Sequence, residues 1–346
     1  MTTSAAAIPR GGLSANARAW LPIAAWSALG IVLLLVAGVQ FGPAATLSIL
    51  TVTIASATPI TFGALTGICS ERTGVVNIGI EGLLLTSAFF GWMVGVYTHN
   101  LGIALLGAVV SSMLMALLHA FLSISLRVDQ IISGTVINIL AVGLTGYLNR
   151  ELFAQGAPPG LTALQRINIP VLSDLPWVGP IVFQQKPLAL TAIVLVFVVH
   201  FMLNRTRWGL RTRAVGEHPL AADTVGINVY QLRYLNVVIG GAIAGLGGAW
   251  LTLESVPHFE PLMTNGVGFI GLAAMIVGKW TPFGAWGAAL LFGLASAIPV
   301  AMQLQNVNVP YEIVSLLPYV LTIVVVAGAV GRATPPAADG KPYVRQ

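Results

Sequence analysis

The feature that most constrains this sequence is a series of apolar runs, each about 20 residues long, which is the length that an α-helix needs to cross a lipid bilayer. These runs recur from residue 20 to residue 330. Only 8% of the 346 residues are charged, whereas a soluble domain has about 25%. Since the runs also lack the alternation of membrane β-strands, we predict an all-α polytopic membrane protein.

The lengths of the apolar runs predict about ten membrane-spanning helices. Residues 1–19 then form a cytoplasmic N-terminal tail, because the run that follows is long for a cleaved signal peptide. Residues 20–330 form the transmembrane domain, and residues 331–346 form a C-terminal tail. The predicted spans are 20–39, 47–69, 75–97, 101–124, 129–148, 188–204, 232–251, 266–279, 283–303 and 313–330, of which the eighth is short enough to be re-entrant.

The distribution of Lys and Arg supports this number of spans and gives an orientation. With both termini on one side of the membrane, all of the 16 Lys and Arg residues except Arg150, Arg166 and Lys186 fall on that side. Acidic residues show no such bias. Because basic residues gather on the cytoplasmic side, both termini are predicted to be cytoplasmic. The connection 149–187 is then external, and the Arg-rich connection 205–233 is cytoplasmic.

A weak internal repeat indicates a transporter. The stretch VVNIGIEGLLL (75–85) resembles VGFIGLAAMIV (267–277), with Ile78 and Gly79 aligned to Ile270 and Gly271. The two copies would cross the membrane in opposite directions. Inverted repeats of this kind are frequent in transporters, where the substrate route lies between the halves.

Polar residues interrupt the apolar sequence at SERTGVVNIGIEG (70–82). Asn77 and Glu81 are four residues apart and would share a face if this stretch were helical. A carboxylate at membrane depth costs about 2.5–3.5 kcal/mol, so Glu81 should face a substrate route or a polar partner in the bundle. Glu71 and Arg72 are predicted to form an interfacial ion pair.

A second polar stripe opens the next predicted span at QIISGTVINIL (130–140). Gln130, Gly134 and Asn138 recur every four residues, with Ser133 and Thr135 beside them. Such a stripe is typical of a pathway lining or of hydrogen bonding between close-packed helices. With Asn77 and Glu81, Asn138 completes the predicted substrate pathway.

The basic connection contains GEHPLAADTVGI (216–227), which predicts a short helix. Pro219 suits its first turn and Gly226 its end. The spacing of Glu217, Ala221, Ala222 and Gly226 fits such a helix. Its small face at Ala221 and Ala222 could sit in a groove of another protein, although a connecting helix lying on the membrane surface has the same pattern.

The sequence lacks the motifs that indicate metal binding, catalysis or ATP binding. Cys69 is the sole cysteine, no cluster of His residues indicates a metal site, and no paired acids or nucleophile with a base indicate an enzyme. No G-x-x-x-x-G-K-[ST] sequence is present, so the chain is not expected to bind ATP through a P-loop. The stretch GGAIAGLGG (240–248) predicts close helix packing.

Together, and in this order, SERTGVVNIGIEG, QIISGTVINIL, GEHPLAADTVGI and VGFIGLAAMIVGKWTPFGAWGAAL (267–290) resemble the inner-membrane permease subunits of ABC importers of the simple-sugar and nucleoside class. These are relatives of the ribose and branched-chain amino-acid permeases. The resemblance covers about residues 47–330 and is closest to the nucleoside-importing subfamily.

The resemblance implies a transport subunit without an enzyme activity or cofactor of its own. It implies a second, homologous permease subunit in a heterodimer, a cytoplasmic ABC ATPase that binds the ATP, and an extracytoplasmic substrate-binding lipoprotein, with no nucleic acid. It also implies that Glu217, Ala221, Ala222 and Gly226 belong to the loop that docks on the ATPase. A simple-sugar permease for ribose or galactose is the alternative, and an ion-coupled secondary transporter is a further one.

Overall fold

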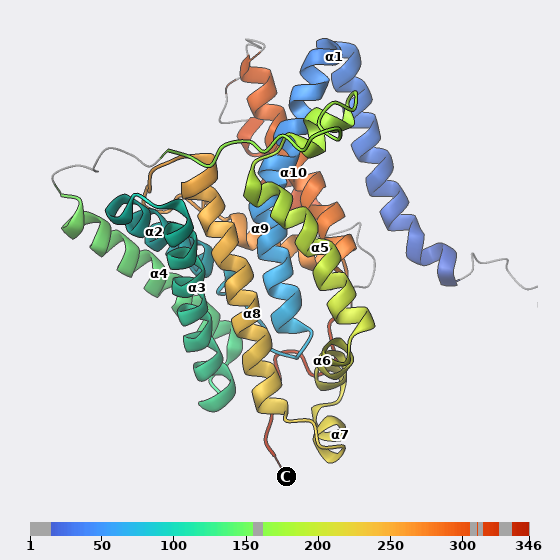
Figure 1. Cartoon of the computed structure of the whole chain (residues 1–346). Helices are drawn as coiled ribbons and strands as arrows, with labels where there is room; N and C mark the ends of the chain where they lie inside the picture. The colour runs from blue at the N-terminus through green and yellow to red at the C-terminus, as the bar shows by residue number, and fades with distance from the viewer. Residues whose placement is uncertain (1–14, 155–161, 305–309, 311–313, 325–333, 346) are drawn as a thin grey trace, which may run out of the picture.

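The computed structural model describes residues 15–154, 162–304, 310, 314–324 and 334–345, without the side chains of residues 15–41, 45, 304 and 324. The described part is helical and contains no strand (Figure 1). Its helices are α1 Ala15–Glu71, α2 Ile80–Thr98, α3 Leu101–Ala120, α4 Gln130–Leu152, α5 Pro187–Arg205, α6 Arg207–Glu217, α7 Pro219–Thr224, α8 Val229–Ala249, α9 Val267–Val277, α10 Pro282–Leu304 and α12 Leu317–Val324. Turns of π-helix, Phe121–Ser125 and Trp250–Ser255, continue α3 and α8, and a third occupies Gly179–Phe183.

Among the described residues, 7 helices are long and apolar enough to cross a membrane. They correspond to seven of the predicted spans, so a multi-pass membrane protein is confirmed. The predicted span 266–279 is too long, because α9 has 11 residues and is therefore roughly 16 Å long, about half the thickness of a bilayer core. The count of ten is not confirmed: the side chains of 20–39 and residues 325–330 lie outside the described part.

Helix α1 covers the first two predicted spans and bends back at Gly42, whose φ of 80° is not helical. The arm that follows Gly42 descends through the centre of the bundle, beside α8, α9 and α10 (Figure 1). Helix α2 packs against α3, α4 and α8. The central arm of α1, α2 and α8 form the core, since 67%, 72% and 67% of their spanning windows are buried, compared with 33%, 28% and 33% for α3, α4 and α5.

Small residues allow this core to pack closely, as the GGAIAGLGG stretch predicts. In α8, Gly241 and Gly245 lie against α3, and Gly248 lies against Leu84 and Ser87 of α2. A side chain at any of these positions would overlap the neighbouring helix. Helix α8 therefore contacts both neighbours almost backbone to backbone, as in other membrane helix pairs rich in small residues.

The predicted span 75–97 begins later than expected, at Ile80. Residues 72–79 form a non-helical connection between α1 and α2, in which Gly74 has a φ of 83°. Asn77 and Glu81 therefore do not share a helix face, and that prediction is wrong. The aligned residues of the proposed repeat also differ, because Ile78 and Gly79 precede α2 whereas Ile270 and Gly271 lie inside α9.

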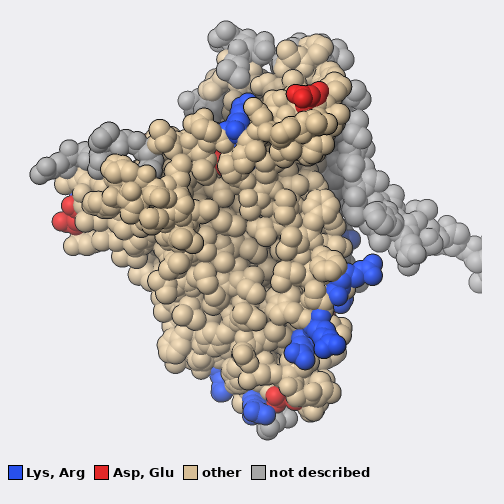
Figure 2. Space-filling model, in the orientation of Figure 1, with Lys and Arg blue, Asp and Glu red and all other residues tan. Residues whose placement is uncertain are grey.

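The predicted cytoplasmic connection 205–233 is mostly helical. It contains α6 and the short α7, which starts at Pro219 and is followed by Gly226 at a φ of 83°. This confirms the predicted short helix and its ends. Figure 2 shows Lys and Arg side chains concentrated at the end of the molecule that carries α6 and α7, with few at the opposite end.

Candidate substrate cavity

A cavity of about 440 Å³ lies where α2, α4, α9 and the loop before α9 meet. Its walls are largely apolar, with a few polar groups among them. The lining residues are Glu81, Gly82 and Leu85 of α2, Asn138, Ile139 and Val142 of α4, Leu262, Thr264, Asn265 and Gly266 of the loop, and Phe269 of α9. None of these residues carries a positive charge.

Glu81 joins α2 to the start of α9. Its two carboxylate oxygens accept the backbone N–H groups of Gly266, at 2.8 Å, and Gly268, at 2.6 Å. Gly268 is required here, because a side chain at that position would overlap Glu81. The N-terminus of a helix carries a partial positive charge, so the Glu81 carboxylate compensates the dipole of α9 at the wall of the cavity.

Asn138 joins α4 to the beginning of α2. Its Oδ1 accepts the N–H of Gly82 at 2.8 Å, and its Nδ2 donates to the carbonyl of Ile78 at 3.0 Å. A carboxamide has two lone pairs and two N–H groups, so one acceptor and one donor of Asn138 stay available. The structure thus brings two of the three predicted pathway residues, Glu81 and Asn138, to one cavity.

Asn77, the third predicted residue, is buried in the α1–α2 connection, at 0% exposure, and does not line the cavity. Its Nδ2 donates to the hydroxyl of Ser70 at 3.3 Å. Its position explains why the sequence contains two polar stretches. The first, residues 70–82, contains the non-helical segment, and the second, residues 130–140, contacts that segment.

The second stripe supplies hydrogen bonds to that non-helical segment. Gln130 Oε1 accepts the N–H of Val76 at 2.7 Å, and His119 bridges the carbonyl of Val76, at 3.1 Å, to the hydroxyl of Ser133, at 2.9 Å. Gly134 allows the connection to pass directly over α4. Backbone groups that leave a helix within a bundle need such partners. Most of the stripe is therefore structural, and Asn138 alone of it also reaches the cavity.

The predicted ion pair between Glu71 and Arg72 is not formed. Glu71 instead accepts the indole N–H of Trp280 at 2.6 Å, and Arg72 Nε donates to the carbonyl of Trp280 at 2.9 Å. Both residues thus hold the turn between α9 and α10. Glu71 and Arg72 therefore bind two different groups of Trp280 instead of each other.

Sequence reasoning missed the rest of the lining, including Thr264, Asn265 and Phe269. The apolar stretch VGFIGLAAMIV gave no signal that Phe269 would be 47% exposed. Asn265 has a positive φ of 42°, and its carbonyl accepts the hydroxyl of Tyr319 at 3.0 Å. The residue type at 265 was a usable signal, because Asn tolerates the left-handed conformation that the chain adopts just before α9.

Residues 48–326 match the family described as the permease component of branched-chain amino acid transport systems. The chain belongs to this family. It is 40% identical over 303 residues to the guanosine ABC transporter permease protein NupQ of Bacillus subtilis, covering 85% of this permease and 95% of NupQ. It is 40% identical over 302 residues to the nucleoside ABC transporter permease protein NupC of Lactococcus lactis, covering 83% and 94%.

A permease named for glucose transport, TsgC13 of Haloferax volcanii, is 35% identical over 307 residues, covering 82% of this permease and 92% of TsgC13. The family assignment confirms the resemblance found in the sequence. It makes this permease a transport subunit and a multi-pass membrane protein.

The predicted docking residues of this permease occupy different surroundings. Ala221 of α7 is exposed, whereas Ala222 is 4% exposed and packs inside the protein against Val215 and Val229. The expected face of two small residues is thus half covered. Leu220 and Val225 present the apolar surface instead, with exposures of 48% and 75%. Glu217 accepts the N–H of Ala337 in the C-terminal segment at 3.3 Å.

Within the described residues, no group of three or more His, Cys, Asp or Glu side chains could hold a metal ion.

Proposed function

We propose that this permease carries nucleosides into the cell as a subunit of an ABC importer, with ATP hydrolysed by a separate partner subunit. The observation that carries the proposal is the 40% identity to NupQ, which extends over 95% of that protein. A match over nearly the whole length includes the cavity, the helix-entry loop and α7 together.

The electrostatics of the cavity support a neutral substrate. Glu81 already compensates the N-terminus of α9 through two hydrogen bonds, and the lining residues include no Lys, Arg or His. A carboxylate or phosphate would find no cation there, and transferring an unpaired charge from water into such a site is costly. This property favours a nucleoside over an amino acid or a nucleotide.

The lining also suits a flat ring with a polar edge. Phe269 offers an aromatic face, and stacking of a base on such a face is worth about 1–3 kcal/mol. Asn138 can donate one hydrogen bond and accept another, which matches the edge of a base or a ribose hydroxyl. In this proposal Glu81 and Asn138 line the substrate route, and Asn77 supports it through the α1–α2 connection.

A second permease subunit, forming a heterodimer with this one, completes the route in our proposal. The cavity wall is open on the α4 side, where Ile139 is 67% exposed, and at the loop, where Leu262 is 58% exposed. An apolar wall of this kind must be covered by lipid or by protein. A similar subunit facing α4 would close the cavity around a substrate.

The ATPase is proposed to bind at α7, where Leu220 and Val225 offer an apolar contact. The concentration of Lys and Arg at this end (Figure 2) supports a cytoplasmic location for α7. In our proposal the protein lies in the inner membrane and both termini are also cytoplasmic. A substrate-binding lipoprotein would then deliver nucleosides at the opposite end. The permease itself needs no cofactor, since the partner binds the ATP.

A simple sugar is the second candidate, and the 35% identity to TsgC13 favours it. A sugar exposes hydroxyl groups around its whole ring, and each one left unpaired in an apolar site lowers affinity. The cavity offers few polar groups for that purpose. The nucleoside is therefore the better match.

The test is uptake of radiolabelled guanosine and uridine by cells that express the complete set of subunits, with excess unlabelled ribose or galactose as competitors. A parallel strain carries an ATPase subunit whose catalytic residue is mutated. We expect uptake that ignores the sugars and requires the active ATPase. Competition by a sugar would identify that sugar as the substrate. Uptake that depends on the proton gradient rather than on the ATPase would identify the protein as a secondary transporter.

A further inference from the structure

The described part of the C-terminal tail, residues 334–345, folds back onto the end of the molecule that carries α6 and α7. The N–H of Ala338 donates to the carbonyl of Gly216, the penultimate residue of α6, at 2.8 Å. Arg233 of α8 donates to the carbonyl of Lys341 at 3.1 Å, and the hydroxyl of Tyr230 donates to the carbonyl of Tyr343, also at 3.1 Å. The backbone of the tail thus has hydrogen-bond partners at Ala338, Lys341 and Tyr343.

Tyr343 forms the centre of a small apolar cluster that is separate from the core of the bundle. Its side chain is 5% exposed and lies among Val215 of α6, Ala222 of α7 and Val229 of α8. The rings of Tyr343 and Tyr230 meet edge to face, with centroids 5.3 Å apart. One aromatic ring from the tail therefore fills the space between three helices.

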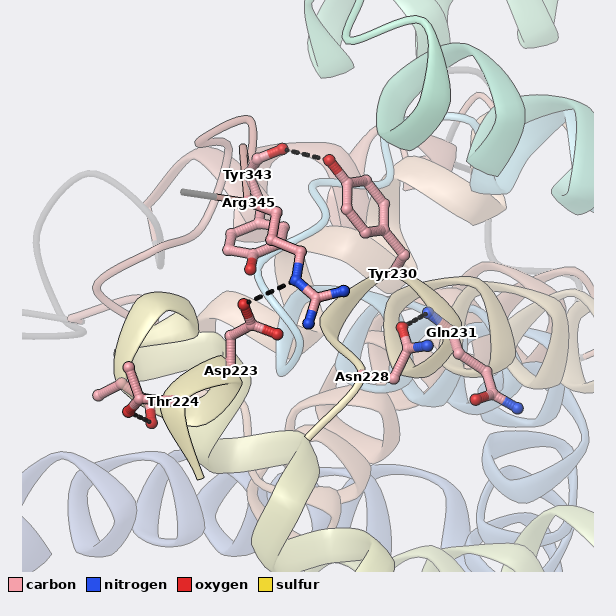
Figure 3. Close-up of polar contacts among 8 residues, drawn as sticks. Asp223, Thr224, Asn228, Tyr230, Gln231, Tyr343 and Arg345 are labelled. Atoms are coloured by element: carbon pink, nitrogen blue, oxygen red, sulfur yellow. Dashed lines mark hydrogen bonds and ion pairs between the residues drawn. The ribbon is translucent and has the colours of Figure 1, made fainter. Parts of the chain in front are cut away.

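Arg345 adds a second, electrostatic contact to the same short helix. Its Nε lies 3.3 Å from Oδ2 of Asp223 in α7. Figure 3 shows the two contacts side by side: Arg345 reaches Asp223, and Tyr343 lies next to Tyr230 on α8. Asp223 and Arg345 form one of two ion pairs among the described residues, the other being His258 with Glu260.

Helix α7 has few other means of fixing its orientation. It contains only 6 residues, and its N-terminus has no side-chain cap. An isolated helix of this length is unstable in water, so neighbouring contacts must hold it. Ala222 faces the tail, while Leu220 and Val225 stay exposed, and the tail therefore supports α7 from the side that is not available to a partner.

The tail also contacts the connection that leads towards the cavity. Arg233, which donates to Lys341 of the tail, donates through Nε to the carbonyl of Thr73 at 3.1 Å. Gly74 has no side chain where the carbonyl of Ala338 approaches it. This connection continues through Asn77 to α2 and Glu81. The tail thus lies between the short helix and the segment that supports the cavity.

We propose that the C-terminal segment 334–345 is a positioning element of the importer: Tyr343 and Arg345 set the orientation in which α7 meets the ATPase, so that ATP hydrolysis is coupled to transport. The proposal rests on the proposed function, because it takes α7 as the ATPase contact. Tyr343 and Arg345 contact neither substrate nor ATP in it.

The experiment uses the complete importer in proteoliposomes and measures two quantities, nucleoside transported and ATP hydrolysed. Tyr343→Ala should lower the number of nucleosides moved per ATP by about tenfold, while Tyr343→Phe keeps the ring and the ratio. Val344→Ala is the matched control, since Val344 is the next residue and 50% exposed.

The ion pair gives a test that does not depend on one destabilising change. Arg345→Asp and Asp223→Arg should each lower the transport ratio by about threefold, as expected for a partly exposed pair, and the double variant with exchanged charges should recover it. Each sample is checked for assembled complex, so that a loss of protein is not read as a loss of coupling.

An unchanged ratio in Tyr343→Ala, with the complex assembled, would overturn the proposal, and so would a double variant no better than the two single ones. A failure of the proposed function gives a different result. In that case the unmodified importer itself would show no ATP-dependent nucleoside uptake.

Discussion

Glu81 and Glu254 make the same contact in two different surroundings. Each carboxylate accepts two backbone N–H groups at the start of a helix other than its own, Glu81 at α9 and Glu254 at α5. Each therefore ties two helices together and compensates a helix dipole. In the sequence each is an acid at one end of a long apolar stretch.

The surroundings separate the two residues. Glu254 is 1% exposed and lies inside the bundle, where water cannot replace a lost hydrogen bond. Glu81 lines the cavity, where water or substrate can reach the same groups. The comparison teaches that an acid in a membrane span is not a transport residue merely because of its charge: its access to a cavity decides what its removal should affect.

The largest expected effect is that of Glu254→Gln on stability. The amide cannot accept both N–H groups of Leu188 and Ala189, and one buried donor loses its partner, at a cost of about 2–3 kcal/mol. We expect a lower thermal unfolding midpoint and less protein in the membrane. Glu260→Gln is the control, because the side chain of Glu260 is 70% exposed. Equal midpoints for the two variants would contradict the buried role of Glu254.

Glu81→Gln should reverse that pattern, with a smaller effect on stability and a larger one on transport per molecule. The orphaned N–H group at the start of α9 can bind water from the cavity, so the cost falls to about 1 kcal/mol. Because α9 forms part of the cavity wall, we expect uptake per assembled importer to fall by about tenfold. Uptake is normalised to the protein present in the membrane. If Glu81→Gln and Glu254→Gln lowered stability equally and left normalised uptake intact, the two acids would have the same structural role.

Phe269→Ala tests the contribution of a cavity-lining side chain to transport without changing a charge. Loss of stacking on one base should raise the half-saturation concentration for guanosine by about tenfold, with little change in the unfolding midpoint, since the ring is 47% exposed. Phe269→Tyr keeps the aromatic face and serves as the control. An unchanged half-saturation concentration for guanosine in Phe269→Ala would show that Phe269 does not contact the substrate.

These residues show what the sequence could predict. The length of the apolar runs in the sequence located seven of the spans, because a helix that faces lipid must be apolar over its whole length. Polar residues in apolar spans marked Glu81 and Asn138. The same reasoning misplaced Asn77, because the break of the helix at residues 72–79 depends on hydrogen bonds from Gln130 and His119 on other helices. Such tertiary partners leave no periodic signal in the segment that they stabilise.

The cavity wall and the tail were harder to predict for a similar reason. Phe269 lies in an apolar stretch in which every residue could equally face lipid. The tail sequence TPPAADGKPYVR (334–345) is typical of an irregular segment, and Tyr343 finds its pocket only after α6, α7 and α8 have come together. Composition indicates where a chain crosses the membrane, whereas contacts between distant segments decide which residues meet.

Asp339 is a third acid, which contrasts with Glu81 and Glu254, and its titration has the smallest expected effect. It lies in the tail beside Arg233, and one of its carboxylate oxygens, Oδ1, has no hydrogen-bond partner. Burial raises the pKa of Asp339 to about 7, although the hydrogen bond from the Gly340 N–H and the charge of Arg233 oppose the shift. The docked tail therefore binds its proton more tightly than the free tail, whose Asp has a pKa of about 3.9.

The sign of the pH effect follows from this difference. Docking of the tail is fully favoured below about pH 4 and weakens as the pH rises through about 7, because the charged carboxylate is better solvated when the tail is free. Hydrogen exchange of residues 334–345, corrected for the intrinsic rate, should therefore show less protection at pH 8 than at pH 6. Asp339→Asn should abolish the difference, since an amide does not titrate. Protection that rises with pH would mean that the ionised carboxylate of Asp339 is stabilised where it lies in the docked tail.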